Sequence, residues 1–167
     1  FVLASVSSLQ AHGINGHIHV TAWAIDELDD PELVELFSNP MVLNAAHFGA
    51  SFPDSGYAVG NNYGELAHWE PFIEAFIQKV KGDHPPPFSS EETRMKVAFV
   101  MGMAAHGLQD ALFDTLFLEQ IATYDGGTQD DADRGTDAFL FTDGHLEHRP
   151  EVWAPVDDLV ETFQNSL

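Results

Sequence analysis

The stretch VAFVMGMAAHGLQDALFDTLF, residues 97–117, decides the fold class of this chain. Its apolar residues recur at intervals of three and four, as they do on a helix, and β-branched residues are scarce. Within it, His106, Asp110 and Asp114 are spaced four apart. Each step of four rotates a side chain by only about 40° around a helix, so the three form one polar stripe. We therefore predict a long helix carrying His-x-x-x-Asp, within an all-α fold.

The rest of the chain has the same periodicity and predicts a single multi-helical domain. Helices are expected at 16–28, from Pro31 through PELVELF, at 65–80, and at 91–123 after a cap at Ser90. The glycine-rich segment SFPDSGYAVGNNYG (51–64) and the acidic segment DGGTQDDADRGTD (125–137) are expected to be loops, and KGDHPPPFSS (81–90) a linker.

Charge and composition exclude several classes of function. The 167 residues include 27 acidic but only 6 basic side chains, which gives a net charge of −21 with histidine neutral. Such a surface repels polyanions, so we expect no nucleic acid as a partner, and anionic membranes are disfavoured unless bound cations intervene. The lack of cysteine excludes disulfides, thiolate metal sites and cysteine nucleophiles. Any metal must be held by histidine, carboxylates or backbone groups, and the sequence has 9 histidines.

The first residues suggest secretion. Residues 1–11 (FVLASVSSLQA) form a short run of apolar and small residues that ends in Ala11, typical of the end of a secretory signal peptide. We expect cleavage after Ala11, a catalytic domain over 12–167, and a secreted or periplasmic location. An ordinary buried first strand or helical turn is the alternative. No apolar stretch approaches the roughly 18 residues that a membrane span needs. Whether a further portion follows PVDDLVETFQ is left open.

A second group of candidate ligands lies upstream of the long helix. Asp54, in FPDSGY, and His68, in ELAHWEPF, are fourteen residues apart, and His17 lies near the start of the chain. A buried carboxylate is costly unless it is paired or metal-bound, and no Lys or Arg lies between residues 96 and 134 to pair with the His106 stripe. Two simpler interpretations stay open: the stripe is the solvated side of an amphipathic helix, and His68 is an ordinary capping or core histidine.

Taken in order, HGINGHIHVTAWAIDEL, FPD, AHWEPF and GMAAHGLQD resemble the zinc-dependent phospholipase C family, and especially the catalytic domain of glycosylphosphatidylinositol-specific phospholipase D. No single piece is specific, and the order and spacing carry the resemblance. It implies an α-helical domain with a cluster of two or three divalent ions between helices.

By residue-for-residue match, the resemblance implies that the first zinc is held by Asp54, His68, His106 and Asp110. Asp110 would bridge to a second ion that is also bound by His17 and by the amine and carbonyl of a processed N-terminal residue. Cleavage after Ala11 would make that residue His12, five positions before His17, as the family pattern requires.

The third ion is where this chain departs from the family. Family members use histidine there, usually with a carboxylate, whereas this chain offers Asp114, Asp133 and Asp137. Three hard carboxylates without an imidazole suit Ca²⁺, Mg²⁺ or Mn²⁺ better than Zn²⁺. The identity and occupancy of that ion are open.

The implied activity is hydrolysis of phospholipid-type phosphodiesters, phospholipase C- or D-like, by a metal-activated water. Asp54 is the candidate general base, the substrate is a phospholipid or another phosphodiester, and contact with a membrane surface would be transient. A single-strand-specific zinc nuclease is an alternative, although the N-terminal Trp and downstream Pro-x-His of those enzymes are absent. A di-iron bundle would need a second Glu-x-x-His besides Glu65 and His68. A non-catalytic module, with Ca²⁺ in segment 125–137, is the third alternative.

Several other side chains carry weaker expectations. Tyr57 and Tyr63 are expected to line the cleft, and His19 to face solvent. The residues expected to pack or to lie away from the site are Trp69, Phe72, Phe76, His84, His145 and His148.

Overall fold

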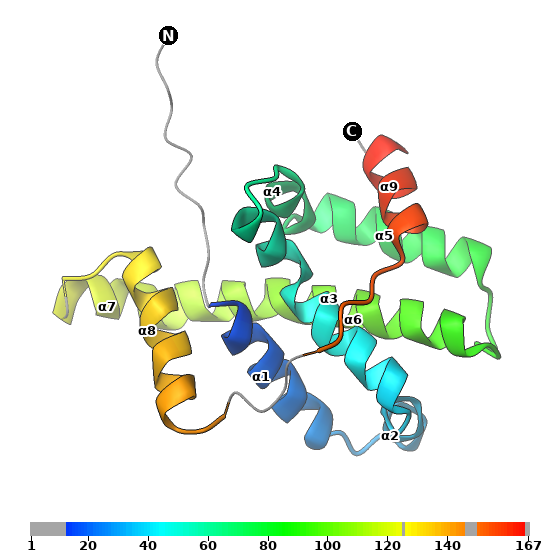
Figure 1. Cartoon of the computed structure of the whole chain (residues 1–167), viewed down its shortest axis with the longest axis horizontal. Coiled ribbons are helices and arrows are strands. Elements are labelled where there is room, and N and C mark those ends of the chain that lie inside the picture. Colours follow the sequence, from blue (N-terminus) through cyan, green and yellow to red (C-terminus); the bar gives the residue numbers. More distant parts are fainter. Residues whose placement is uncertain (1–12, 125, 146–149, 166–167) are drawn as a thin grey trace, which may run out of the picture.

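A computed structural model describes residues 13–124, 126–145 and 150–165, and the regular structure within them is helical throughout, which confirms the all-α prediction (Figure 1). The elements are α1 (Ile14–Asp26), α2 (Pro31–Phe37), α3 (Pro40–Ala58), α4 (Tyr63–Ala67), α5 (Glu70–Asp83), α6 (Glu91–Phe113), the π-helical segment η1 (Asp114–Leu118), α7 (Glu119–Tyr124), α8 (Gln129–Thr142) and α9 (Val156–Asn165). Among the described helices, none combines the length and the apolar character that crossing a bilayer requires.

Two helix starts lie where the sequence predicts them. Pro31 opens α2, and the side chain of Asp30 accepts hydrogen bonds from the amides of Glu32 and Leu33 at 2.9 and 3.1 Å. Ser90 caps α6 by accepting from the amide of Thr93 at 3.1 Å. Local capping chemistry therefore positions the start of the long helix that carries the polar stripe.

The hydrophobic core lies among α3, α5, α6 and α9. Phe76 of α5 and Phe99 and Met103 of α6 are fully enclosed. The rings of Phe72 and Phe163 stack at 4.0 Å and hold α9 against α5. Packing of this core fixes the middle of α6, from which the His-x-x-x-Asp stripe continues.

Helices α3 and α6 approach each other so closely that their backbones touch. A Cβ atom added at Gly102 would collide with the carbonyl oxygen of Ala46, and one added at Gly49 would collide with that of Phe99. Ala46 and Ala50 lie in the same contact, and both are buried. Only glycine permits this approach, which brings the faces of α3 and α6 to backbone contact just before the polar stripe.

The prediction of a loop over 51–64 is wrong for most of its length. Helix α3 runs through Pro53 to Ala58, and only residues 59–62 connect it to α4. The glycines and proline suggest a loop, but they serve close packing, since Gly56 lies against Gly64. Residues 49–54 are all buried, and tertiary burial outweighs the helix-breaking tendency of Pro53.

The predicted helix over 65–80 is divided in two. Helix α4 ends at Ala67, Trp69 is extended, and α5 begins at Glu70 with Pro71 in its first turn. Proline suits a first helical turn because the amide it lacks has no partner there. The break leaves His68 at the end of α4, where its ring turns toward α3 and α6.

The acidic segment 125–137 also differs from the prediction, because most of it is helix α8. Thr128 and Asp131 form a reciprocal capping box at its start, a T-x-x-D pattern that is visible in the sequence. Before it, the predicted helix over 91–123 is found as α6, η1 and α7 in succession.

The close α3–α6 contact yields the first prediction. Gly102→Ala should lower the free energy of unfolding by about 1–3 kcal/mol, because the added methyl forces the two backbones apart. Gly135→Ala is the matched control: it lies within α8 with open space around its Cβ position, and should stabilise the protein by about 0.4–1 kcal/mol. Urea unfolding measures both. Equal stability of the two variants would contradict the packing account.

Candidate metal centre

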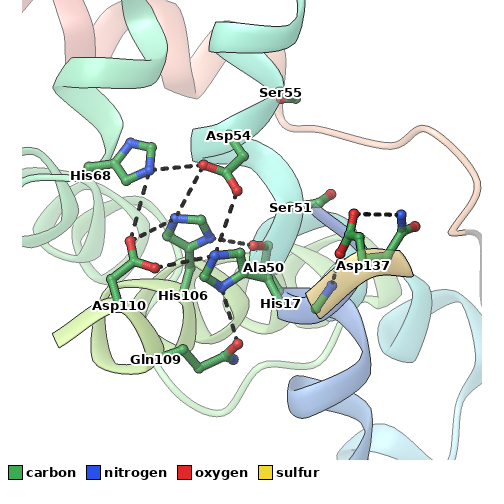
Figure 2. A network of polar contacts seen from close by, with 12 residues as sticks. His17, Ala50, Ser51, Asp54, Ser55, His68, His106, Gln109, Asp110 and Asp137 are labelled. Carbon is green, nitrogen blue, oxygen red and sulfur yellow. Dashed lines mark hydrogen bonds and ion pairs between the residues drawn. The ribbon is translucent and has the colours of Figure 1, made fainter. Parts of the chain in front are cut away.

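Side chains from different helices meet at one buried point beside the α3–α6 contact (Figure 2). Asp54 extends from the buried face of α3, and His106 and Asp110 continue the four-residue stripe along α6. His17 comes from the first turn of α1, and His68 follows α4. The sequence predicts that these five residues converge, although they are spread between residues 17 and 110, and the structure brings all five together.

The three histidines all direct Nε2 toward the two carboxylates. For Asp110, Oδ1 lies 3.2 Å from Nε2 of His17, while Oδ2 lies 3.2 Å from that of His106 and 4.0 Å from that of His68. For Asp54, Oδ1 lies 3.2 Å from Nε2 of His68, and Oδ2 lies 3.6 Å from that of His17. Each carboxylate thus spans from His17 on one side to His68 on the other.

The opposite nitrogens of the His68 and His106 rings each face a backbone carbonyl. Nδ1 of His68 lies 2.6 Å from the carbonyl oxygen of Gly64, and Nδ1 of His106 lies 2.7 Å from that of Ala50. A carbonyl oxygen only accepts, so both Nδ1 atoms carry the hydrogen. Nε2 of each neutral ring therefore directs its lone pair into the cluster, the arrangement of metal-binding histidines.

Burial and the close charges set the protonation states. Burial lowers the pKa of His106 and outweighs the opposing effect of Asp110. Burial would raise the pKa of Asp110, but the effect of the neighbouring His106 and His17 rings outweighs burial and lowers that pKa. Burial also lowers the pKa of His68, yet the hydrogen bonds of its two ring nitrogens outweigh it and the pKa is raised. An ionised Asp110 therefore faces a neutral His106 at neutral pH.

This donor set fits a divalent cation. Lone pairs of imidazole nitrogens and carboxylate oxygens repel one another at these distances unless a proton or a cation lies between them. Over residues 13–124, 126–145 and 150–165, no Lys or Arg forms an ion pair with Asp54 or Asp110. Two sets of ligand atoms lie mutually within 4.8 Å: those of His17, Asp54 and His106, and those of His68, His106 and Asp110. Nitrogen and oxygen donors without sulfur match zinc among other divalent metals.

The cluster opens to solvent on one side. The side chains of Asp110 and His68 are 18% and 10% exposed, whereas those of His17, Asp54 and His106 are fully enclosed. A ligand must therefore approach over Asp110 and His68.

Beside this opening, Tyr57 and Trp69 share one carboxylate. The Tyr57 hydroxyl donates to Glu65 at 2.7 Å, and Nε1 of Trp69 donates to the other oxygen at 3.0 Å. The Tyr57 ring lies 5.2 Å from that of His68 and also lines a cavity of ≈630 Å³. The residues lining that cavity include none of the five cluster residues, so the expectation that Tyr57 lines the cleft stays a prediction, while Tyr63 packs on Phe52 at 5.0 Å.

The structure does not bring Asp114, Asp133 and Asp137 to one point. Asp137 accepts hydrogen bonds from the side chain of Asn15 and the amide of Gly16, at 2.9 and 3.0 Å, and so binds the start of α1. Asp133 is buried on the same helix, and Asp114 begins η1. Among the described residues, no set of three ligand atoms within 4.8 Å includes any of the three. The contact that the structure shows is that of Asp137 with α1, and joint metal binding by the three carboxylates stays a prediction.

The remaining histidines lie as follows. His12 lies outside the described residues, so its assignment stays a prediction, and so does the proposed cleavage. His19 is buried against the rings of Trp23 and His145, at 4.1 and 4.9 Å, so the expectation that it faces solvent is wrong. His84 lies between Thr93 and Lys96 at the far end of α6, away from the cluster.

Two contributors to the centre have no signal in the sequence. The Ala50 carbonyl that orients His106 is a backbone group, which no side-chain pattern marks in the sequence. Gln109 faces His17 at 3.1 Å, and only the helical phase of its neighbour Asp110 hints at its place. The roles of the Ala50 carbonyl and of Gln109 depend on how α1, α3 and α6 pack, which the sequence alone does not indicate.

Comparison with curated proteins finds phosphatidylinositol-glycan-specific phospholipases D. The chain is 27% identical to that of Dictyostelium discoideum over 182 aligned residues, which cover 98% of this chain and 19% of that protein. It is 28% identical to the rat protein over 141 residues, 73% of this chain and 16% of the relative. With the bovine protein it shares 31% identity over 83 residues, 46% of this chain and 10% of the relative.

These similarities support a distant relationship to phosphatidylinositol-glycan-specific phospholipases D. The chain spans no more than 19% of the length of these relatives. No model of a known protein family matches the chain, and no solved structure matches it.

The donor geometry predicts stabilisation by zinc. At a free zinc concentration 100 times the dissociation constant, the free energy of unfolding should rise by about 2.7 kcal/mol for one site. His106→Ala should abolish most of this rise, because it removes a ligand shared by both sets. His84→Ala should retain it. Thermal unfolding with and without zinc gives the result, and a full zinc response in His106→Ala would contradict the assignment.

The position of Asp137 predicts a structural effect that needs no metal. Asp137→Ala removes the acceptor of Asn15 and Gly16 at the start of α1, and should lower the free energy of unfolding of the metal-free protein by about 0.5–2 kcal/mol. Exposed Asp29→Ala is the control. Unchanged stability in metal-free urea unfolding would contradict the role, and loss of bound Ca²⁺ or Mn²⁺ would support the oxygen-only third site.

Proposed function

We propose that the chain is the catalytic part of a secreted, metal-dependent phosphodiesterase of the zinc-dependent phospholipase C type, acting on phospholipid-type phosphodiesters. The observation that carries this proposal is the buried cluster of three imidazole Nε2 atoms and two carboxylates. The distant relationship to phosphatidylinositol-glycan-specific phospholipases D supports the class of bond and substrate. Secretion is inferred from residues 1–11 alone.

The proposed ligands are His17, Asp54, His68, His106 and Asp110, with Asp110 bridging two positions. Its two oxygens face different histidines, as a bridging ligand requires. When bound, divalent ions supply Lewis-acid stabilisation of phosphoryl oxygens and make a nearby water easier to deprotonate. The amine of His12 and a site at Asp114, Asp133 and Asp137 remain additional predictions.

Asp54 is the proposed general base. Its Oδ2 is buried and has no hydrogen-bond partner among the described residues, so it is available to accept a proton from the attacking water. Its Oδ1 lies 3.2 Å from Nε2 of His68, so a proton or a cation between the two atoms would hold the carboxylate in one orientation. The His68 ring is itself held by a hydrogen bond to the Gly64 carbonyl. This backbone contact fixes the position of the ring beside Asp54.

The open side over Asp110 and His68 is the proposed place for the substrate phosphate. The chain carries a net charge of −21 and would repel a phosphodiester in the absence of local positive charge. Cations held by this cluster would reverse the sign of the potential only there. Binding of an anionic substrate is thereby confined to the opening of the cluster.

Hydrolysis of a chromogenic phosphodiester by the zinc-loaded chain tests the proposal. Activity should vanish with chelator and return with zinc. Asp54→Asn should lower kcat by about 10²-fold or more because it removes the base, while His84→Ala should leave kcat unchanged.

The alternatives predict other outcomes. Preferential cleavage of single-stranded DNA over phospholipid vesicles would favour the nuclease. Zinc-dependent stability without hydrolysis of any phosphodiester would favour a non-catalytic module. Full activity in Asp54→Asn would exclude Asp54 as the base.

A further inference from the structure

We infer that Gln109, anchored by Thr21, is a positioning residue that holds His17 in the tautomer with the hydrogen on Nδ1. The inference rests on the proposed function, because that tautomer directs the lone pair of His17 Nε2 toward a cation position beside Asp54 and Asp110. It concerns two residues outside the ligand set, one on α6 and one on α1.

The contacts form a short buried chain of hydrogen bonds. Nδ1 of His17 lies 3.1 Å from Oε1 of Gln109, and Nε2 of Gln109 donates to Oγ1 of Thr21 at 2.9 Å. All three residues are buried, with Gln109 only 8% exposed. Figure 2 shows the amide beneath the His17 ring, on the side opposite the carboxylates. With its amide nitrogen donating to Thr21, Gln109 turns its amide oxygen toward the ring, and an amide oxygen only accepts.

His17 needs this partner more than the other histidines do. His68 and His106 face backbone carbonyls at Nδ1, and a carbonyl cannot offer a hydrogen. A glutamine side chain can rotate and present its NH₂ group instead. The ring would then carry its hydrogen on Nε2, which lies 3.2 Å from Asp110 and would donate to it.

The carboxylates therefore compete with Gln109 for the hydrogen of His17. Asp110 and Asp54 favour a hydrogen on Nε2, which blocks the lone pair a cation requires. Gln109 favours a hydrogen on Nδ1 while its oxygen faces the ring, and in that orientation its amide nitrogen donates to Thr21, one turn beyond His17 on α1. Loss of either contact should shift the ring toward the tautomer that cannot bind metal.

Three variants of the full chain separate these effects. Gln109→Met keeps the length of the side chain but removes the acceptor, and Gln109→Glu keeps an acceptor while losing the donor to Thr21. Thr21→Val removes only the anchor. Long-range ¹⁵N–¹H NMR of the histidine rings in the metal-free protein reports each tautomer, and competition with a chromophoric chelator reports zinc affinity.

In the wild type, we expect all three rings to carry the hydrogen on Nδ1. In Gln109→Met, His17 should change to Nε2–H while His68 and His106 do not change, and zinc affinity at the position that includes His17 should fall about 10- to 100-fold. Gln109→Glu should restore both the tautomer and the affinity. Thr21→Val should give a mixture of His17 tautomers and an intermediate affinity.

A His17 ring that keeps its hydrogen on Nδ1 in Gln109→Met would overturn the inference. An unchanged His17 tautomer in Thr21→Val would overturn the anchoring role of Thr21. If Gln109→Met fails to fold, the His17 tautomer in Thr21→Val tests the inference in its place. A wild type that binds no zinc but shows the expected tautomer changes would refute the proposed function and leave the role of Gln109 supported.

Discussion

The backbone contact between α3 and α6 is the constraint on which the metal centre depends. Gly49 and Gly102 allow the two helices to touch, and any larger residue at either position meets a carbonyl oxygen. One turn further along α6, this proximity puts Nδ1 of His106 within 2.7 Å of the Ala50 carbonyl. Another turn along α3 lies Asp54, facing the same ring. The small residues and the polar stripe are thus consecutive parts of the interface between α3 and α6. The small residues set the distance between the two helices, and the polar side chains lie between them one turn further on.

The acidic character of the protein indicates what kind of ligand this cluster suits. Two carboxylates lie among three imidazoles at a site that is mostly enclosed, and the described Lys and Arg ion pairs lie elsewhere: Lys79 and Lys96 pair with acidic residues of α5, α6 and α9. A buried, uncompensated pair of carboxylates is costly for a fold that binds nothing there. It is well matched to a cation, which would offset the charge and, under the proposed function, would attract the substrate phosphate to the opening of the cluster.

Much of the centre could be predicted from the sequence, but not all of it. Spacing of four on a helix places His106 beside Asp110 without tertiary information, and capping residues locate the starts of α2 and α6. Glycine and proline around Asp54 suggest a loop because their local preference is visible, whereas the burial that keeps α3 helical is not. The acidic residues before Arg134 suggest a loop for a similar reason, although the T-x-x-D pattern of Thr128 and Asp131 indicates the start of a helix there. The side toward which Asp137 points depends on where α8 packs, and that is a property of the fold alone.

Crystallographic location of zinc tests the central claim most directly. Diffraction data from crystals of the zinc-loaded chain, collected above and below the zinc absorption edge, should give an anomalous peak inside the cluster. Zinc should lie at about 2.0–2.1 Å from Nε2 of His68 or His106, with a carboxylate oxygen of Asp54 or Asp110 completing the site. Zinc bound through Nδ1 atoms, zinc held only at histidines outside the cluster, or a cluster without any anomalous peak would contradict it.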